Sequence, residues 1–330
     1  MITIFMKRHP PEELIQLERL AVRLPTSHHK YAYIQTKYHQ LKAGHAGEIY
    51  VDRVLQEISY PRGVKVLTDI RLEINPHFQI QIDTLIVSPH SIILLEVKYY
   101  AGTVNFNEDS GKTTKIASNG EIDKYDCIIH QLDRATVGLK TWLEKRNISI
   151  PVIPILVMAN GQTEISVVPD SITLKYAKQL PRYIRTLLVE TESLQAYPST
   201  SIAEMIVADQ VSWSMTPACQ RYEIVPAHLI RGVLCSSCHS PMDRKRGHSW
   251  ICYACRKKDP GALEVAIKDW FLLIGHTVSN KQLRFFLDLK SSAAASIIFS
   301  QSSGMLRLGN APHTFYTFNK AQVNSVGKSR

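Results

Sequence analysis

The chain has 330 residues, enough for two or three domains of ordinary size, and its 45% hydrophobic and 21% charged residues are typical of globular proteins. No apolar run reaches the roughly 18 residues that a membrane-spanning helix needs, so no such helix is expected. The N-terminal residues are followed by acidic residues rather than by a long apolar stretch, so the sequence predicts no signal peptide and a cytoplasmic location.

The net charge of +10 is concentrated in the last third of the chain. Residues 1–225 contain 24 Lys/Arg and 24 Asp/Glu, whereas residues 226–330 contain 15 Lys/Arg and 5 Asp/Glu. This asymmetry indicates that the C-terminal part binds a polyanion, with nucleic acid as the expected partner. A solvated basic surface without a ligand is the alternative.

Residues 11–58 have a helical pattern. Pro10 and Pro11 precede two acidic residues, a favourable first turn, and leucines then recur at helical spacing. The segment Pro25-Thr26-Ser27 breaks the pattern. A second helix is expected to open after Gly44-His45-Ala46-Gly47 and to carry Glu48.

Residues 64–158 are expected to form an α/β core together with the preceding helix. Strands are predicted at 64–67, 78–87, 92–99 and 151–158, with a further strand beginning at 103–106, a loop or hairpin at 107–123 and a helix over 125–147. Residues 161–230 mix short apolar runs with helical patterns at 182–190 and 201–206, and are interpreted as a continuation and connector.

Three charged residues interrupt apolar strand-like runs. Asp83 lies within Gln81-Ile82-Asp83-Thr84-Leu85, and Glu96 and Lys98 follow Leu94-Leu95 on one face of the next predicted strand. Burying a charge costs several kcal/mol, roughly, unless a partner compensates for it. Two carboxylates can hold a divalent cation against a phosphate oxygen, and a lysine can position the attacking water. Exposed charge pairs are the alternative, but the flanking residues are strongly apolar.

These segments resemble a known family. Gly44-x-x-Gly47-Glu48, Phe78 to Ile86 and Ile93-Leu94-Leu95-Glu96-Val97-Lys98 are similar to the nuclease-related domain of bacteria, over about residues 38–158. The resemblance implies the restriction-endonuclease-like fold of the PD-(D/E)xK type, with Glu48, Asp83, Glu96 and Lys98 as the active-site set.

The resemblance is weaker at one place. The family usually has a segment with proline and asparagine before a glutamine that begins the next helix. Here the stretch is Tyr125-Asp126-Cys127-Ile128-Ile129-His130-Gln131, so Gln131 is present but the prolines and asparagine are not. Gln131 can bind a substrate phosphate or an active-site carboxylate, or can be an ordinary exposed helix residue. Arg71 and Gln81 lie near the site in sequence, and a structural role is preferred for both.

Four of the six cysteines form two Cys-x-x-Cys pairs, Cys235 with Cys238 and Cys252 with Cys255. Thirteen residues separate the pairs, room for a hairpin that brings four thiolates together around Zn²⁺. The sequence therefore predicts a structural zinc ribbon, with His239 or His248 as less favoured substitute ligands. Basic residues at Arg244-Lys245-Arg246 and Arg256-Lys257-Lys258 are typical of zinc ribbons that bind nucleic acid.

The last segment is expected to form a small winged-helix-like domain. Helices are predicted over 262–274, from a Ser279-Asn280 cap to Leu287, and over 293–300, followed by a hairpin of 305–308 and 314–318. The third of these helices carries few side chains able to read bases, so sequence-specific recognition is not expected, and docking of a partner is the alternative.

Together these features predict an α/β fold: a restriction-endonuclease-like core with a mixed sheet flanked by helices, a zinc ribbon and a winged-helix-like domain. The expected segments are 1–37 (helical), 38–160 (nuclease-like), 161–230 (continuation and connector), 231–258 (zinc ribbon) and 259–330 (winged-helix-like). The expected function is a nuclease dependent on Mg²⁺ or Mn²⁺ acting on DNA, with Asp83 and Glu96 as metal ligands. The alternatives are a non-catalytic nucleic-acid-binding adaptor and an RNA substrate.

Overall fold

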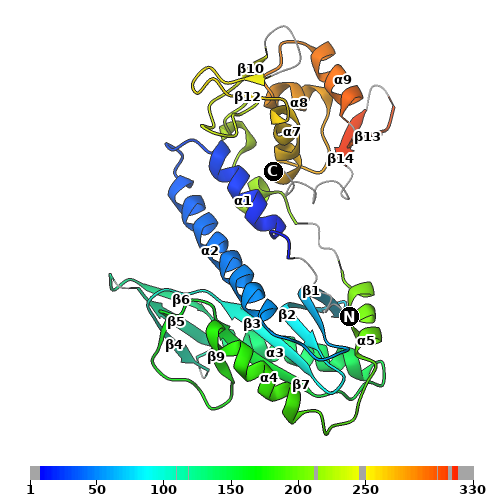
Figure 1. Ribbon diagram of the computed structural model, residues 1–330. Helices are drawn as coiled ribbons and strands as arrows, with labels where there is room; N and C mark the ends of the chain where they lie inside the picture. The colour runs from blue at the N-terminus through cyan, green and yellow to red at the C-terminus, as the bar shows by residue number, and fades with distance from the viewer. Residues whose placement is uncertain are drawn as a thin grey trace. The chain divides into compact units, whose positions relative to one another are not determined.

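The computed structural model describes residues 8–108, 110–117, 119–211, 215–244, 250–302, 304–310 and 314–318. These residues fall into two compact units (Figure 1): unit 1 contains Arg8 and residues 42–211, and unit 2 contains residues 9–41 and 215–318. This division into two units does not test the five segments predicted from the sequence, whose boundaries at 37, 160, 230 and 258 stay predictions. Within the described ranges, no helix combines the length and the apolar character needed to cross a lipid bilayer.

The centre of unit 1 is a five-stranded mixed sheet in the order β1-β2-β3-β7-β9. Strands β1, β2 and β3 pair antiparallel, whereas β3, β7 and β9 run parallel. The strands are β1 (Lys65–Asn75), β2 (Phe78–Val87), β3 (Ile92–Lys98), β7 (Val152–Met158) and β9 (Leu174–Tyr176). The predicted strands are thus present, and β1 is longer than predicted because its second half pairs with β2.

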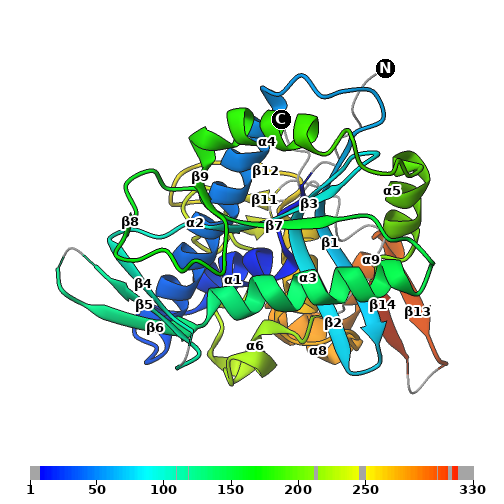
Figure 2. The same ribbon diagram turned by 90° about the horizontal axis from the view of Figure 1, so that it is seen from below.

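Helices cover both faces of this sheet, and they bury its β-branched and leucine side chains. Helix α3 (Ile128–Glu144) runs across one face (Figure 2), where residues of α5 (Ser199–Ala208) join the same apolar cluster. The other face packs against the second half of α2 (Tyr31–Gln56) and α4 (Leu180–Glu190), which follows the 3₁₀ turn Ala177–Gln179. A mixed sheet flanked by helices confirms the predicted α/β class.

Unit 1 contains a second sheet in the order β6-β5-β4-β8. Its strands are β4 (Thr103–Asn107), β5 (Lys112–Ile116), β6 (Ile122–Asp126) and the short β8 (Glu164–Ile165). The segment predicted as a loop or hairpin is therefore a hairpin. Its buried Thr113 accepts a hydrogen bond from the backbone N–H of Ile128 at 3.2 Å, so a side chain of β5 caps the start of α3.

One prediction is wrong: the helix that carries Glu48 does not open after Gly47. Helix α2 begins at Tyr31 and passes through Gly44 and Gly47 without a break. Gly47 lies within this helix at a place where neighbouring segments come very close. A Cβ atom there would lie 2.9 Å from the Cβ of Tyr99 and 3.1 Å from that of Ala159, so only glycine fits without a shift. Tyr99 directly follows β3, so the missing side chain of Gly47 lets α2 approach the end of β3 and places Glu48 beside it.

Unit 2 gathers the first helix and the C-terminal third of the chain around one apolar cluster. It contains α1 (Glu12–Arg23), α6 (Ala218–Arg221), the 3₁₀ turn Pro226–His228, α7 (Ala262–Leu273), α8 (Asn280–Phe286), α9 (Ser292–Gln301) and the antiparallel hairpin β13 (Met305–Leu308) and β14 (Phe315–Phe318). Three short strands, β10 (Asp243–Arg244), β11 (Trp250–Ile251) and β12 (Lys258–Asp259), pair within the cysteine module. The three helices and the hairpin follow the predicted order.

A buried ion-pair network joins α1 to α7. The carboxylate of Asp269 is fully buried and accepts hydrogen bonds from Arg19 Nε and Arg23 Nε, both at 2.5 Å. The guanidinium of Arg23 also donates to the carbonyl of Ile230 at 2.8 Å and lies 4.5 Å above the ring of Phe286. Sequence reasoning treated residues 1–37 as a separate segment and gave no sign of this partnership.

Replacing Asp269 with alanine is expected to destabilise unit 2 by about 3–5 kcal/mol, because it leaves the buried guanidinium of Arg23 without its carboxylate. Urea unfolding followed by the fluorescence of Trp270 and Trp250 measures the loss. The exposed Asp288 provides the control. Asp288→Asn removes the charge of a pair with Arg231 at 3.8 Å between exposed side chains, and asparagine tolerates the left-handed backbone of this position (φ 54°). Equal unfolding midpoints for Asp269→Ala and Asp288→Asn would contradict a structural role for the buried network.

Candidate active site and candidate metal centre

Asp83 lies where β2 and β3 separate. The ladder between these strands ends at the pair Thr84–Leu95, one step before Asp83 would face Glu96. Beyond the last pair, the backbone N–H of Val97 donates to Asp83 Oδ2 at 2.7 Å instead of to the main chain of β2. The carboxylate thus takes the place of a ladder partner, and this bond fixes it beside the end of β3.

Strands β1 and β2 both bend at this level. Asp69, opposite Asp83 in the register of β1 and β2, has a left-handed backbone (φ 51°). In β2, Ile82 and Leu85 contribute to the same apolar cluster although they are three residues apart, which a regular strand does not allow. The side chains of Arg71 and Gln81 both contact Asp69 Oδ1, at 3.3 Å and 3.2 Å. The contacts of both side chains therefore lie at the bend.

Glu96 and Lys98 project from one face of β3, as their i, i+2 spacing predicts. Glu96 is 1% exposed, and its Oε1 accepts a hydrogen bond from Lys98 Nζ at 2.7 Å. Asp83 is 8% exposed. The structure therefore buries two carboxylates, and it places the ammonium of Lys98, whose side chain is 20% exposed, against one of them.

Burial raises the pKa of the Asp83 carboxyl well above its usual value, and the nearby carboxylates of Glu96 and Glu48 add to this shift against the opposing effect of Lys98. Burial alone would lower the pKa of the Lys98 ammonium, but the carboxylates of Glu96 and Asp83 outweigh it and hold that pKa above the usual value. The region thus carries one cation for two buried carboxylates, a balance that a bound divalent cation would improve.

This balance predicts a pH dependence of stability in the absence of added divalent ions. A raised carboxyl pKa means that the folded state binds the proton of Asp83 more tightly than the unfolded state, so stability falls as the pH rises from about 4 through the raised pKa. Asp83→Asn removes this loss and keeps an oxygen for the N–H of Val97. We expect its melting temperature to exceed that of the wild type at pH 8 by at least about 2–4 °C, the shift for ~1 kcal/mol in a domain of this size, and to match it near pH 4.

Thermal unfolding followed by circular dichroism at pH 4, 6 and 8 measures this difference. Asp133→Asn, at an exposed position on α3, is the control and should follow the wild type at every pH. A constant difference between Asp83→Asn and the wild type across this range would contradict the assigned burial cost.

Glu48 lies on α2, and its side chain is 24% exposed. Its carboxylate forms an ion pair with Arg8, a residue near the N-terminus. Arg8 Nη1 donates to Glu48 Oε2 at 2.9 Å, and Arg8 Nε donates to Asp52 Oδ2 at 2.8 Å. Asp52 is one helical turn after Glu48. Arg8 Nη2 also donates to the main-chain carbonyl of Asp83 at 2.8 Å and to Thr84 Oγ1 at 3.1 Å.

Arg8 therefore joins α2 to the bent part of β2, with a side chain that is only 4% exposed. Sequence reasoning missed Arg8 and Asp52. Asp52 had a recognisable signal, since its spacing from Glu48 puts both carboxylates on one helix face. Arg8 had none, because it is separated from Glu48 by 40 residues and lies in a segment with no regular pattern.

Gln131 is placed differently from the other predicted site residues. It lies in the first turn of α3, and its side chain is exposed. Within the part of the chain that the structure describes, no hydrogen bond or ion pair joins this side chain to Asp83, Glu96 or Lys98. The structure thus associates Glu48, Asp83, Glu96 and Lys98 and leaves Gln131 outside their contacts.

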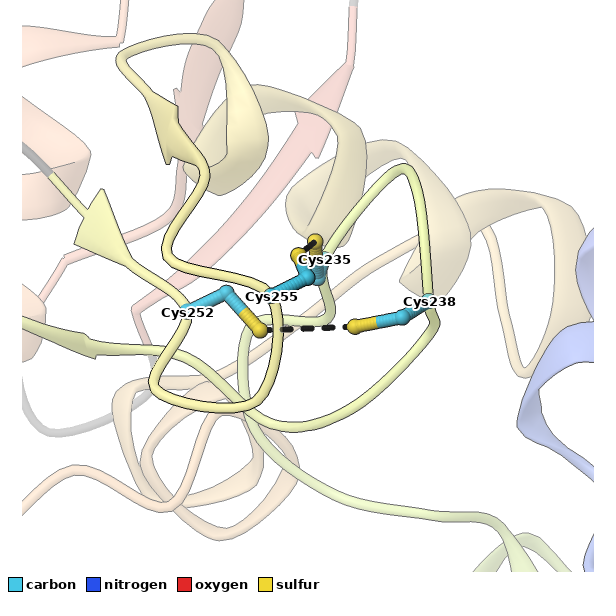
Figure 3. Close-up of side chains that lie close together, drawn as sticks. All are labelled: Cys235, Cys238, Cys252 and Cys255. Carbon is cyan, nitrogen blue, oxygen red and sulfur yellow. Dashed lines mark hydrogen bonds between the residues drawn. The ribbon is translucent and has the colours of Figure 1, made fainter.

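The four paired cysteines converge in unit 2 (Figure 3). Cys235 Sγ lies 3.5 Å from Cys255 Sγ, Cys238 Sγ lies 3.4 Å from Cys252 Sγ, and all four sulfur atoms lie within 4.8 Å of one another. Four thiolates around Zn²⁺ at about 2.3 Å have similar separations, so the cluster is compatible with a structural zinc ion. Among the described residues, these four cysteines are the only group of three or more His, Cys, Asp or Glu side chains whose ligand atoms lie close enough to hold one metal ion.

The two Cys-x-x-Cys turns have the same backbone geometry. The N–H of Cys235 donates to the carbonyl of Ser240, and that of Cys252 donates to the carbonyl of Lys257, each over five residues and each at 2.9 Å. The residue after the second cysteine is left-handed in both turns, with φ 57° at His239 and 59° at Arg256. Backbone and side-chain hydrogen bonds from Ser240 lower the pKa of the Cys238 thiol to about 6, which favours the thiolate.

Of the two histidines considered as substitute zinc ligands, the structure describes only His239. His239 is exposed and is not part of the convergent group, whereas His248 lies outside the described residues, as do Lys245 and Arg246 of the predicted hairpin tip.

Comparison with known families identifies part of unit 1. Residues 43–159 match the family of the nuclease-related domain. The match begins one residue before Gly44 and ends just after β7, so it includes Glu48, Asp83, Glu96 and Lys98 and confirms the resemblance seen in the sequence. No curated protein and no solved structure matches the chain.

Proposed function

We propose that this chain, whose residues 43–159 form a nuclease-related domain, is a metal-dependent nuclease that hydrolyses phosphodiester bonds in DNA. One observation carries the proposal: the buried carboxylates of Asp83 and Glu96 lie where β2 and β3 separate, and Lys98, with a side chain 20% exposed, pairs with Glu96. A fold gains no stability from two buried carboxylates with one ammonium as their counter-charge, so a chemical role accounts for their placement better than a structural one.

The proposed metal ligands are Asp83 and Glu96. Two carboxylates with an otherwise open coordination sphere suit Mg²⁺ or Mn²⁺, which keep several positions for water and phosphate oxygens. When bound, such an ion polarises the scissile phosphate and lowers the pKa of its water. The hydrogen bond from the Val97 N–H orients the Asp83 carboxylate, and the pair with Lys98 orients that of Glu96.

Lys98 remains protonated at neutral pH, because its pKa is held above the usual value. It therefore acts as a donor that positions the attacking water and stabilises negative charge on the phosphate, rather than as a general base. Glu48 assists at the edge of the site. Arg8 is proposed as a positioning residue, because its guanidinium binds the carboxylates of Glu48 and Asp52 and, through Nη2, the main-chain carbonyl of Asp83.

Unit 2 is proposed to serve nucleic-acid binding. The cysteine cluster would hold Zn²⁺ as a structural ion, since its four thiolates leave no open position for a substrate. The excess positive charge of residues 226–330 then forms a basic surface on a zinc-stabilised scaffold.

The test of the proposed activity is incubation of the purified full chain with linear and circular duplex DNA, single-stranded DNA and RNA. Each substrate is combined in turn with Mg²⁺, Mn²⁺ or no added divalent ion. We expect cleavage of DNA only with Mg²⁺ or Mn²⁺. Binding of DNA without cleavage under all conditions would instead support the adaptor, and cleavage confined to RNA would replace the substrate class.

A further inference from the structure

Unit 2 contains a polar recess of about 540 Å³ between helix α8, helix α9 and the hairpin β13–β14. Its walls are formed by Asn280, Lys281, Arg284, Ser292, Ser296, Arg307, Thr314 and Tyr316. No leucine, isoleucine, valine or phenylalanine lines it, so its chemistry suits a charged or polar ligand rather than an apolar one.

Three cations come together in this recess. Lys281 and Arg284 are three residues apart on α8 and share one face, and Arg307 reaches the recess from β13. Among the described residues, no carboxylate forms an ion pair with any of these three side chains. Arg307 Nη2 donates only to Thr314 Oγ1, at 3.5 Å.

The surrounding sequence cannot supply that carboxylate. No Asp or Glu occurs after Asp288, although five Lys and Arg do. The acidic side chains of residues 262–288 already pair elsewhere in unit 2: Glu264 with Lys268, Asp269 with Arg19 and Arg23, and Asp288 with Arg231. The positive charge of the recess is therefore uncompensated by any acidic side chain near it in sequence.

Hydrogen bonds hold the walls of the recess in place. Asn280 Nδ2 donates to the carbonyl of Ser292 and to Ser296 Oγ, both at 3.1 Å, and Ser292 Oγ donates to Asn280 Oδ1 at 3.2 Å. These bonds tie the start of α8 to α9. On the hairpin side, the ring of Tyr316 stacks on Phe299 with centroids 3.6 Å apart. Rigid walls lower the entropy that is lost when a ligand binds.

We propose that this recess docks the phosphodiester backbone of duplex DNA without reading its base sequence. Lysine, arginine, serine, threonine, asparagine and tyrosine side chains are the groups that proteins use to contact nucleic-acid phosphates. On the neighbouring helix α9, the exposed Ala293 and Ile297 cannot form hydrogen bonds with base edges. The other exposed residues of α9 are three serines, each already hydrogen-bonded within the protein, and Gln301 at its last position. The inference rests on the proposed function in one respect, that DNA is the substrate.

The test is fluorescence anisotropy of labelled DNA duplexes of two unrelated sequences, without added divalent ions, so that no cleavage interferes. The variant Lys281→Glu/Arg284→Glu is expected to bind both duplexes at least about 30-fold more weakly, and adding Arg307→Glu extends the loss beyond about 100-fold. The slope of log K against log salt should become shallower by about one for each phosphate contact removed.

Helix α4 offers a matched control. Arg182 and Arg185 have the same i, i+3 spacing and are exposed, so Arg182→Glu/Arg185→Glu changes the net charge equally without touching the recess. This control should lose less than about threefold. Zinc content and melting temperature are compared for all variants, and Lys281→Gln/Arg284→Gln is used if charge reversal disturbs folding.

Equal losses in the recess and control variants would overturn the proposal, as would a loss confined to one duplex sequence or to RNA. Saturable binding of inorganic phosphate with an affinity near that for the duplex would show a small-anion site and would also overturn it. Failure of the proposed function looks different. If recess variants bind normally while the wild type cuts DNA, only the docking proposal fails, whereas a wild type that binds through the recess and never cuts refutes only the nuclease.

Discussion

Lys98→Ala is expected to lower metal-dependent DNA cleavage by about 10²–10³-fold, and Asp83→Ala is expected to abolish it. The ammonium of Lys98 pairs with the buried carboxylate of Glu96, and removing one preorganised electrostatic donor commonly costs about 10²–10³-fold in rate. Asp83→Ala removes one of only two proposed protein ligands of the ion. Initial cleavage rates at saturating Mg²⁺, for wild type and variants at equal concentration, measure both effects.

The control for charge is Lys140→Ala, at an exposed position on α3, which should cut at the wild-type rate. Lys98→Ala leaves Glu96 buried without its partner, so a second variant guards against loss of folding. Glu96→Gln/Lys98→Met keeps the volume of the pair and removes both charges, and it should fold and remain inactive. Cleavage by folded Asp83→Ala or Lys98→Ala at the wild-type rate would refute the assignment of the site.

Cys252→Ser is expected to remove the bound zinc and to unfold the cysteine module, with a loss of most of the cooperative unfolding transition of unit 2. Structural Zn²⁺ contributes roughly 10–16 kcal/mol of apparent binding free energy in zinc-finger peptides, which is folding free energy there. Cys235 and Cys252 belong to the same apolar cluster as α1, α7, α8 and α9, so loss of the module should propagate into that cluster. Metal analysis and calorimetry of the full chain measure the two effects.

Wild type is expected to contain one zinc ion per chain. Cys127→Ala is the control, because Cys127 is buried in unit 1 and is not part of the convergent group. It should retain zinc and the unit 2 transition, and His239→Ala should do the same. Unchanged zinc content in Cys252→Ser, or zinc loss in His239→Ala, would show that the ligand set differs from the four cysteines.

The sequence by itself determined the order of β1, β2, β3, α3 and β7 in unit 1, because buried strands require apolar runs and helices a spacing of three to four residues. It also identified Asp83, Glu96 and Lys98, since charges within such runs are rare. The four cysteines were equally clear, because a tetrahedral ion constrains both pairs to short turns. These signals are local, and each depends on residues close together in the chain.

Only the tertiary structure showed what depends on contacts between distant segments. The start of α2 was misplaced because glycine in a sequence usually marks a turn, whereas Gly47 is a helix residue that permits a contact with Tyr99. Arg8 and the pairing of Arg23 with Asp269 gave no local signal, since ion pairs over 40 and 246 residues follow from packing rather than from periodicity. The recess of Lys281, Arg284 and Arg307 is of the same kind: the sequence gave the excess positive charge, and the fold of α8, α9 and the hairpin decided where three of those charges meet.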